Sequence, residues 1–327
     1  MKARLIPLFI LFTLLLSACA PQATPQATAT QLIPVRLPVG YIPNVQFAPL
    51  YVAIEKGYYR EAGLDVTIDY SMENDNTVLT ATGDLQFAVV SGEQVLLARA
   101  QQMPVVYVMA WYQEYPVAIV AKKEAGIKSV ADLKGRKIGL PGLYGASYIG
   151  AIALLDSAGL KESDVILDSI GYNQVEMLVS NKDDAVVVYV ANEPVQLQKM
   201  GIEIDQFKVS DAVDLVSNGI ITNEKTLQED PELVQAVVSA TLKGMNYTIQ
   251  HPDEAFEISK KYVENLAEGD AELQMEILNR SIAQWQAERI GYSDPKGWEN
   301  MQRILLQMGL LKEELDLNAA YDNRFIP

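Results

Sequence analysis

Residues 37–70 read LPVGYIPNVQFAPLYVAIEKGYYREAGLDVTIDY, and their pattern indicates an α/β fold. Residues 37–41 predict a strand, which Pro43 and Asn44 interrupt. The next apolar side chains follow the i, i+3, i+4, i+7 spacing of an amphipathic helix: Phe47, Leu50, Tyr51 and Ile54. A second strand is predicted over 64–70. A strand, a helix and a strand in this order imply a parallel sheet with helices on its faces.

The same alternation continues along the chain. Further strands are predicted over 85–90, 105–111, 117–121, 165–170, 185–190 and 219–222, with a short helix and a strand within 127–139. Helices are predicted over 91–100, where Ser91 and Gln94 match a capping box, over 145–158, over 173–180 with Asn173 as cap, and from Asn192. After Pro231 the pattern is helical over 231–250, 253–264, 270–287 and 295–309.

The length of the chain favours two lobes. About 290 residues remain after the N-terminal segment, more than one typical core accommodates. We expect lobe one to comprise 36–116 and 223–327, and lobe two to comprise 117–222. The strands near 117–121 and 219–222 are the expected crossovers. Two linking strands form a hinge, so a ligand is expected in the cleft between the lobes.

The N-terminus has the features of an export signal. Lys2 and Arg4 precede an apolar run over 5–16, which is shorter than the ~20 residues of a spanning helix. Small residues then precede Cys19, as in the lipobox of bacterial lipoproteins, so we expect a signal peptide over 1–18 and lipidation of Cys19 by acyl chains such as palmitate. The alternative is an ordinary secretory signal with an incidental cysteine. Residues 19–35 include an uncharged Pro, Ala, Thr and Gln segment and are expected to be a flexible tether.

The charge of the chain excludes some partners. The formal net charge is −16, without a basic stripe, which disfavours nucleic-acid binding. Anionic lipid should repel so acidic a chain. Association with a membrane is therefore expected through the lipid anchor alone, and we expect a protein held at the cell membrane on its extracytoplasmic side.

Polar and aromatic side chains follow several predicted strands, where ligands of such sheets gather. The candidate ligand-binding residues are Asn44, Gln46, Phe47, Asn74, Ser91, Glu93, Trp111, Tyr112, Tyr115, Tyr144, Ser147, Tyr148, Tyr172 and Asn192. Aromatic faces stack on a flat heterocycle, and amides both donate to and accept from its polar edges. Core packing is the alternative role for Trp111 or Tyr112, and helix capping for Ser91 and Asn192.

Catalytic and metal-binding motifs are missing from the sequence. The one histidine, His251, lies in a helix junction, Cys19 is the one cysteine, and no phosphate-loop or nucleophile-elbow motif occurs. We therefore expect no enzyme, no metal site and no cofactor. An alkanesulfonate ligand is disfavoured because no arginine lies in the candidate loops. The expected helix N-terminus at 145–148 keeps an anion site open as an alternative.

Two segments resemble a known family. Residues 41–66, from Tyr41 to Val66, and residues 129–139, from Ser129 to Gly139, closely resemble the periplasmic-binding-protein family that serves ABC importers of alkanesulfonates, thiamine-precursor pyrimidines and related compounds. The similarity extends over about 37–310. Residues 41–53, 89–94 and 140–148 look most like the riboflavin-binding lipoproteins of this family. Pyrimidine-binding relatives usually carry a Thr-Asn-His-like sequence where this chain has Val45-Gln46-Phe47.

This resemblance implies a two-lobed periplasmic-binding-protein fold of type II and a function. The chain is expected to capture riboflavin outside the cytoplasm and to deliver it to an ABC permease with its ATPase subunits. A thiamine-precursor pyrimidine or an alkanesulfonate is the alternative ligand in the same role. A pyrimidine-biosynthetic enzyme or a sensor domain is the alternative of another class.

The anchor can be tested directly. Mass spectrometry of the protein extracted from membranes should find acyl chains on Cys19 and no residue before it. An unmodified Cys19 in that material would contradict the anchor.

Overall fold

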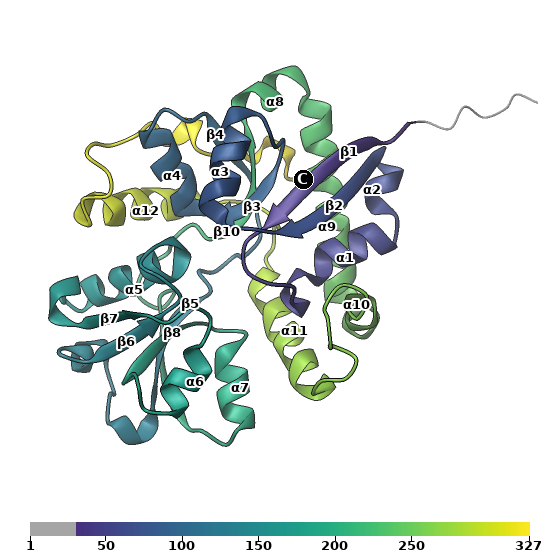
Figure 1. Cartoon of the computed structure of the whole chain (residues 1–327). Coiled ribbons are helices and arrows are strands. Elements are labelled where there is room, and N and C mark those ends of the chain that lie inside the picture. The colour runs from purple at the N-terminus through teal and green to yellow at the C-terminus, as the bar shows by residue number, and fades with distance from the viewer. Residues whose placement is uncertain (1–30) are drawn as a thin grey trace, which may run out of the picture. The chain divides into compact units, whose positions relative to one another are not determined.

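Two five-stranded sheets form the framework of the computed structural model, which describes residues 31–327 (Figure 1). The signal peptide, Cys19 and most of the expected tether lie outside the described residues. The first sheet has the order β2 (Leu64–Tyr70), β1 (Ile33–Val39), β3 (Ala88–Ser91), β10 (Asn218–Asn223), β4 (Val105–Ala110). The second has the order β7 (Ile166–Ser169), β6 (Lys137–Leu140), β8 (Ala185–Tyr189), β5 (Val117–Lys122), β9 (Ile204–Lys208).

Each sheet contains an antiparallel strand that follows a crossing between the lobes. β1 pairs in parallel with β2 and β3, as the sequence predicts, but β10 runs antiparallel to β3 and β4. In the second sheet β5 runs antiparallel to β8 and β9. Both sheets are therefore mixed. β5 and β10 are the first strands after the chain passes from one sheet to the other, and each runs antiparallel to its two neighbours.

The crossings differ from the expected ones. β5 and β10 belong wholly to their sheets, and the segments that connect the sheets are 111–116 and 209–217. Ending lobe two at 222 is wrong, because β10 pairs with strands of the first sheet. Extending the tether to 35 is also wrong, because Ile33–Val35 already pair with Leu64–Val66.

Helices cover both sheets (Figure 1). α3 was not predicted, because its Asn and Thr residues form helices poorly. The predicted helix 253–264 ends at Ser259, and a turn follows in which Asn265 has a φ of 60°. The helices are α1 (Ala48–Glu55), α2 (Tyr58–Glu61), α3 (Glu73–Thr82), α4 (Gly92–Ala100), α5 (Gly145–Ser157), α6 (Gln174–Val179), α7 (Glu193–Lys199), α8 (Glu224–Glu229), α9 (Pro231–Gln250), α10 (Pro252–Ser259), α11 (Ala271–Trp285) and α12 (Pro295–Gln307).

Two of the predicted helix caps are wrong. Ser91 precedes α4, but its side chain donates to the Glu73 carboxylate and accepts no N–H group of the helix. Asn173 precedes α6, and its side chain donates to the Ile170 carbonyl. Asp230 and Asp270 do accept backbone N–H groups of α9 and α11, in the manner of N-caps.

The buried side chains alternate along the central strands, as a sheet covered on both faces requires. On β5, Val117, Ile119 and Ala121 face one apolar cluster, whereas Ala118 and Val120 face another. The first of these clusters continues from α5 to α4 and α12, so one core joins the two lobes. Among residues 31–327, no helix is long and apolar enough to cross a bilayer.

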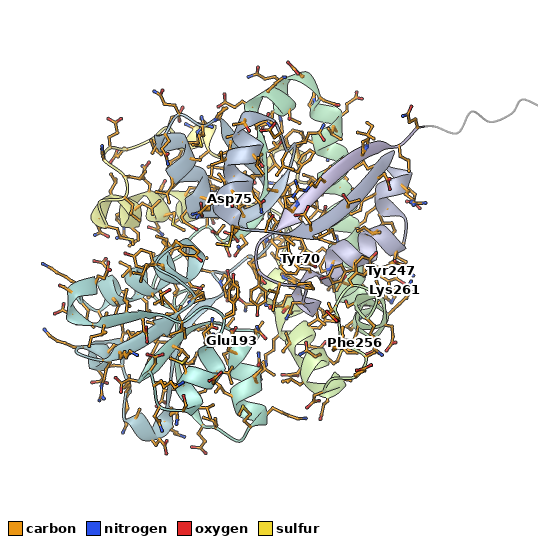
Figure 2. All side chains as sticks on the ribbon, viewed as in Figure 1. Tyr70, Asp75, Glu193, Tyr247, Phe256 and Lys261 are labelled. Atoms are coloured by element: carbon orange, nitrogen blue, oxygen red, sulfur yellow. The ribbon has the colours of Figure 1, made fainter. Side chains whose placement is uncertain are left out.

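The helix layer of lobe one depends on close packing of α1 against α9. A Cβ atom on Gly244 of α9 would lie 2.2 Å from the Pro49 carbonyl oxygen and 2.8 Å from the Ala53 Cβ, so only glycine fits between the helices. At the edge of this layer, Lys261 binds Glu55 at 2.5 Å (Figure 2). Since exposed ion pairs contribute little, the apolar contact holds the layer.

Replacing Gly244 tests this packing. Gly244→Ala should lower the free energy of unfolding by about 2 kcal/mol or more, because overpacking exceeds the gain in helix propensity. Urea unfolding measures the change. Lys243→Ala, on an exposed position of the same helix, is the control and should change stability by about 0.5 kcal/mol or less. Equal stabilities of the two variants would contradict the close packing.

Candidate ligand-binding site

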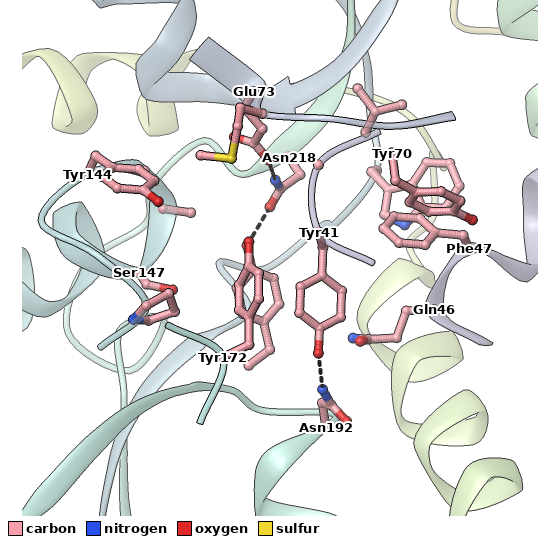
Figure 3. Close-up of a pocket in the computed structure, with 18 of the residues that line it drawn as sticks. Tyr41, Gln46, Phe47, Tyr70, Glu73, Tyr144, Ser147, Tyr172, Asn192 and Asn218 are labelled. Atoms are coloured by element: carbon pink, nitrogen blue, oxygen red, sulfur yellow. Dashed lines mark hydrogen bonds between the residues drawn. The ribbon is translucent and has the colours of Figure 1, made fainter. Parts of the chain in front are cut away.

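A cavity of about 400 Å³ lies where the carboxyl ends of strands from both sheets meet (Figure 3). This volume is typical of small-molecule sites. Aromatic side chains are the largest group in its walls, with amides and two carboxylates between the rings. The lining consists of Gly40, Tyr41, Gln46, Phe47, Tyr70, Ser71, Met72, Glu73, Asn74, Val89, Trp111, Tyr112, Pro141, Tyr144, Gly145, Ala146, Ser147, Tyr172, Gln174, Tyr189, Asn192, Glu193 and Asn218.

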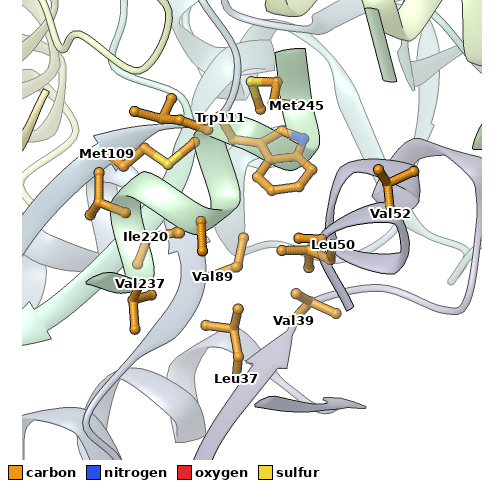
Figure 4. Packing of buried hydrophobic residues seen from close by; sticks show 14 of the residues in the cluster. Leu37, Val39, Leu50, Val52, Val89, Met109, Trp111, Ile220, Val237 and Met245 are labelled. Carbon is orange, nitrogen blue, oxygen red and sulfur yellow. The ribbon is translucent and has the colours of Figure 1, made fainter. Parts of the chain in front are cut away.

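Trp111 anchors the aromatic wall in the core. It is 1% exposed and belongs to the same apolar cluster as Leu50 and Met245 (Figure 4). Its ring centroid lies 6.4 Å from that of Phe47 and 6.1 Å from that of Trp285. Trp111 therefore has both roles that the sequence left as alternatives, since it packs in the core and lines the cavity.

Tyr41 reaches across the cavity from lobe one. Its φ of 78° is unusual for a residue other than glycine. The Tyr41 hydroxyl accepts from Asn192 Nδ2 at 3.4 Å, and its ring meets Tyr172 edge-on at 4.8 Å. Because Asn192 and Tyr172 belong to lobe two, this side chain connects the lobes beside the cavity.

Glu73, the first residue of α3, has three hydrogen-bond donors. Asn218 Nδ2 donates to its Oε1 at 3.1 Å, whereas the Ser91 backbone N–H and Oγ donate to its Oε2 at 3.1 and 2.8 Å. Asn218 in turn accepts from the Tyr189 hydroxyl of lobe two at 3.0 Å. A Cβ atom on Gly40 would lie 2.6 Å from Glu73 Oε1, so a glycine leaves room for this carboxylate.

A proton count assigns the charge of the neighbouring carboxylate. Ser91 Oγ lies within hydrogen-bond distance of both Glu73 and Glu93, but a hydroxyl has one proton to donate. If that proton goes to Glu73, Glu93 must itself donate to Ser91. Burial raises the pKa of Glu93 to about 7, with the charge of Glu73 as a further cause. Burial raises the pKa of Glu73 as well, but its three hydrogen-bond donors lower it, so we assign Glu73 as the ionised member of the pair and Glu93 as the neutral acid.

Glu193 is the carboxylate that lobe two contributes to the cavity lining (Figure 2). It begins α7, accepts the Tyr189 N–H at 2.9 Å and accepts Asn192 Nδ2 at 3.1 Å. Burial raises its pKa to about 7. The cavity thus meets one carboxylate from each lobe.

Nine of the fourteen predicted ligand-binding residues lie in the lining of this one cavity. They come from both lobes and from loops far apart in the sequence. The nine are Gln46, Phe47, Asn74, Trp111, Tyr112, Tyr144, Ser147, Tyr172 and Asn192.

The other five predicted residues lie outside the lining. Asn44 accepts the Gln46 N–H and so caps a 3-10 turn. Ser91 and Glu93 are buried behind Glu73. The Tyr115 hydroxyl donates to the Ala146 carbonyl. Tyr148 follows Ser147 on α5, so the helical turn directs it away from the cavity, and it donates to Glu162.

Several lining residues were not among the predicted set. Tyr41 was expected inside a strand, but β1 ends at Val39 and the left-handed turn brings Tyr41 to the cavity. Asn218 was missed because β10 was expected to be a crossover and not a strand of the first sheet. Tyr70 ends β2, so the rule that ligands gather at carboxyl ends of strands would have found it.

Comparison with known proteins shows the family of this chain. Residues 44–255 match the family described as NMT1/THI5 like. The chain belongs to this family. The resemblance seen in the sequence is therefore confirmed.

Three curated relatives of the NMT1/THI5-like chain differ in function. Riboflavin-binding protein RibY of Chloroflexus aurantiacus is 39% identical, and the alignment covers 100% of this chain and 99% of RibY. A 4-amino-5-hydroxymethyl-2-methylpyrimidine phosphate synthase of Legionella pneumophila is 26% identical over 90% of this chain and 92% of its own length. The formylaminopyrimidine-binding protein of Halalkalibacterium halodurans is 32% identical, with 79% and 78% covered.

The fold is that of periplasmic binding proteins. The periplasmic aliphatic sulphonate binding protein SsuA from Escherichia coli matches with a TM-score of 0.72, at 13% identity, over 88% of this chain and 96% of SsuA. The predicted two-lobed α/β fold is confirmed.

The buried acids predict a pH dependence of stability. The pKa of Glu93 is raised from 4.5 to about 7 on folding, so the native state binds the proton more tightly than the unfolded state. Stability should therefore be greatest below about pH 4.5 for this group and fall as the pH rises toward about 7. Glu93→Gln keeps a neutral side chain, so the loss of unfolding free energy between pH 5 and 8 should shrink by about 2 kcal/mol.

Urea unfolding at pH 5 and 8 measures this difference. Glu313→Gln, which removes an exposed carboxylate, is the control and should leave the pH dependence unchanged. A Glu93→Gln variant with the pH dependence of the parent protein would show that Glu93 is ionised in the native state.

Proposed function

We propose that this protein is the extracytoplasmic solute-binding subunit of an ABC importer and that its ligand is riboflavin. The observation that carries the proposal is the aromatic-walled cavity between the lobes. A flavin has a flat ring system with apolar faces and polar edges. Phe47, Tyr70 and Trp111 supply aromatic surface, and Gln46 and Asn192 supply amides that donate and accept.

The identity with RibY supports the same ligand. It extends over the whole chain, whereas the formylaminopyrimidine-binding protein aligns with about four-fifths of it at lower identity. A thiamine-precursor pyrimidine is thus the second candidate ligand. An alkanesulfonate is favoured less, since the described cavity lining includes no Lys, Arg or His to pair with a sulfonate.

We propose that the protein is not an enzyme. The synthase relatives show that the family includes enzymes. Within the described lining there is neither His nor Cys to serve as an acid, base or nucleophile. Across 31–327, no three His, Cys, Asp or Glu side chains are grouped to hold a metal ion.

Capture would occur by closure of the lobes on the solute. Besides the contacts of Tyr41 and Tyr189, Lys199 of α7 binds Glu272 of α11 at 2.5 Å and Asp270 at 3.5 Å. A ligand that contacts both lobes stabilises the closed arrangement relative to the open one. The closed form would then dock on the permease, which works with its ATPase subunits. Lipidated Cys19 would hold the protein at the extracytoplasmic face of the cell membrane.

Thermal melting with three ligands tests the assignment. Riboflavin at 100 times its Kd should stabilise the purified protein by about 2.7 kcal/mol and raise its Tm, whereas a formylaminopyrimidine and taurine should raise it less. Flavin fluorescence should be quenched as the ring stacks on Trp111 or a tyrosine. A larger shift with the pyrimidine would favour the second candidate, and no shift or quenching with riboflavin would overturn the flavin assignment.

A further inference from the structure

Three helices near the cavity each have a glutamate in their first turn. Glu73 begins α3, Glu93 lies in the first turn of α4, and Glu193 begins α7. A helix N-terminus attracts anions because its N–H groups are unpaired and its dipole is positive there. In this protein carboxylates already take those positions.

The contact of Glu73 is the most direct case. Its Oε2 accepts the backbone N–H of Ser91, which is the residue that precedes α4, and also accepts Ser91 Oγ. Glu73 therefore binds at the start of α4 as an anionic ligand would. At the same time it lines the cavity and presents its charge there.

The other charges around the cavity are either negative, like that of Glu73, or weak. Glu193 adds a second carboxylate from lobe two, and no lining residue in the described chain is Lys, Arg or His. The N-terminus of α5 also lines the cavity and has no acidic residue in its first turn. Its dipole is equivalent to about half a positive charge, which is less than the two carboxylates together.

We propose that Glu73 is an internal anion at the N-terminus of α4 and that, together with Glu193, it makes the cavity select uncharged ligands over phosphorylated or sulfonated ones. The inference rests on the proposed function and refines it, since it restricts the ligand to riboflavin without its 5′-phosphate. Repulsion acts here because the aromatic rings that line the cavity partly exclude water, so charge is screened less than in bulk water.

Titration with riboflavin and riboflavin 5′-phosphate tests this selection by quenching of flavin fluorescence at pH 8, which is above the pKa of about 7 that burial gives Glu193. The parent protein should bind the phosphate at least about tenfold more weakly. Glu73→Gln should reduce this ratio at least about threefold, and Glu193→Gln provides a second variant should the first fail to fold. Raising the salt concentration should reduce the ratio in the parent protein, because the cavity is partly open to solvent and salt screens the repulsion.

Asp75→Asn is the matched control. Asp75 lies in the same first turn of α3 (Figure 2), carries the same charge and is exposed outside the lining, so its loss should leave the ratio unchanged. Equal affinity of the parent protein for both flavins would overturn the selection and leave the flavin assignment intact. A ratio that neither Glu variant reduces would assign the selection to shape and overturn the role of charge. Failure to bind riboflavin at all would overturn the proposed function and this inference with it.

Discussion

The antiparallel pairing of β10 between β3 and β4 is the constraint on which the binding site depends. The chain leaves the first sheet after β4, builds the second sheet and then returns to the first sheet between β3 and β4. Both connections between the lobes are therefore anchored next to each other in one sheet. The same pairing sets Asn218 opposite Ser91, so that it contacts Glu73 on one side and Tyr189 of the other lobe on the opposite side.

The cavity combines an aromatic surface with a set of hydrogen-bonded polar groups, as small-molecule sites commonly do. Its aromatic wall is continuous with the core through Trp111, so the rings are held in place by packing that the fold needs in any case. Its polar groups form a hydrogen-bonded chain from Glu93 through Ser91, Glu73 and Asn218 to Tyr189. Rigid rings and partnered polar groups both limit the entropy that a ligand must offset on binding.

Much of this architecture could be predicted from local pattern. α9 was predicted with its observed bounds, because Pro231 starts the helix and the apolar residues repeat regularly. α3 was missed because it is held by tertiary contacts that its own residues do not signal. Strand ends predicted the cavity as a region, but not which side chains of each loop face it. The left-handed backbone turn at Tyr41 directs its side chain into the cavity. The position of Tyr148 on its helix directs that side chain away from the cavity, toward Glu162.

The single proton of Ser91 also limits how this protein can diverge. The side chains at positions 73, 91 and 93 share the protons of one hydrogen-bonded group. Which residue is tolerated at position 93 therefore depends on the residues at 73 and 91. Losing the hydroxyl leaves two acids facing each other without a donor between them, while losing Glu73 removes one of the causes that keep Glu93 neutral. Among homologues the residues at these three positions should therefore change together. A homologue with a different residue at one position should also have different residues at the other two.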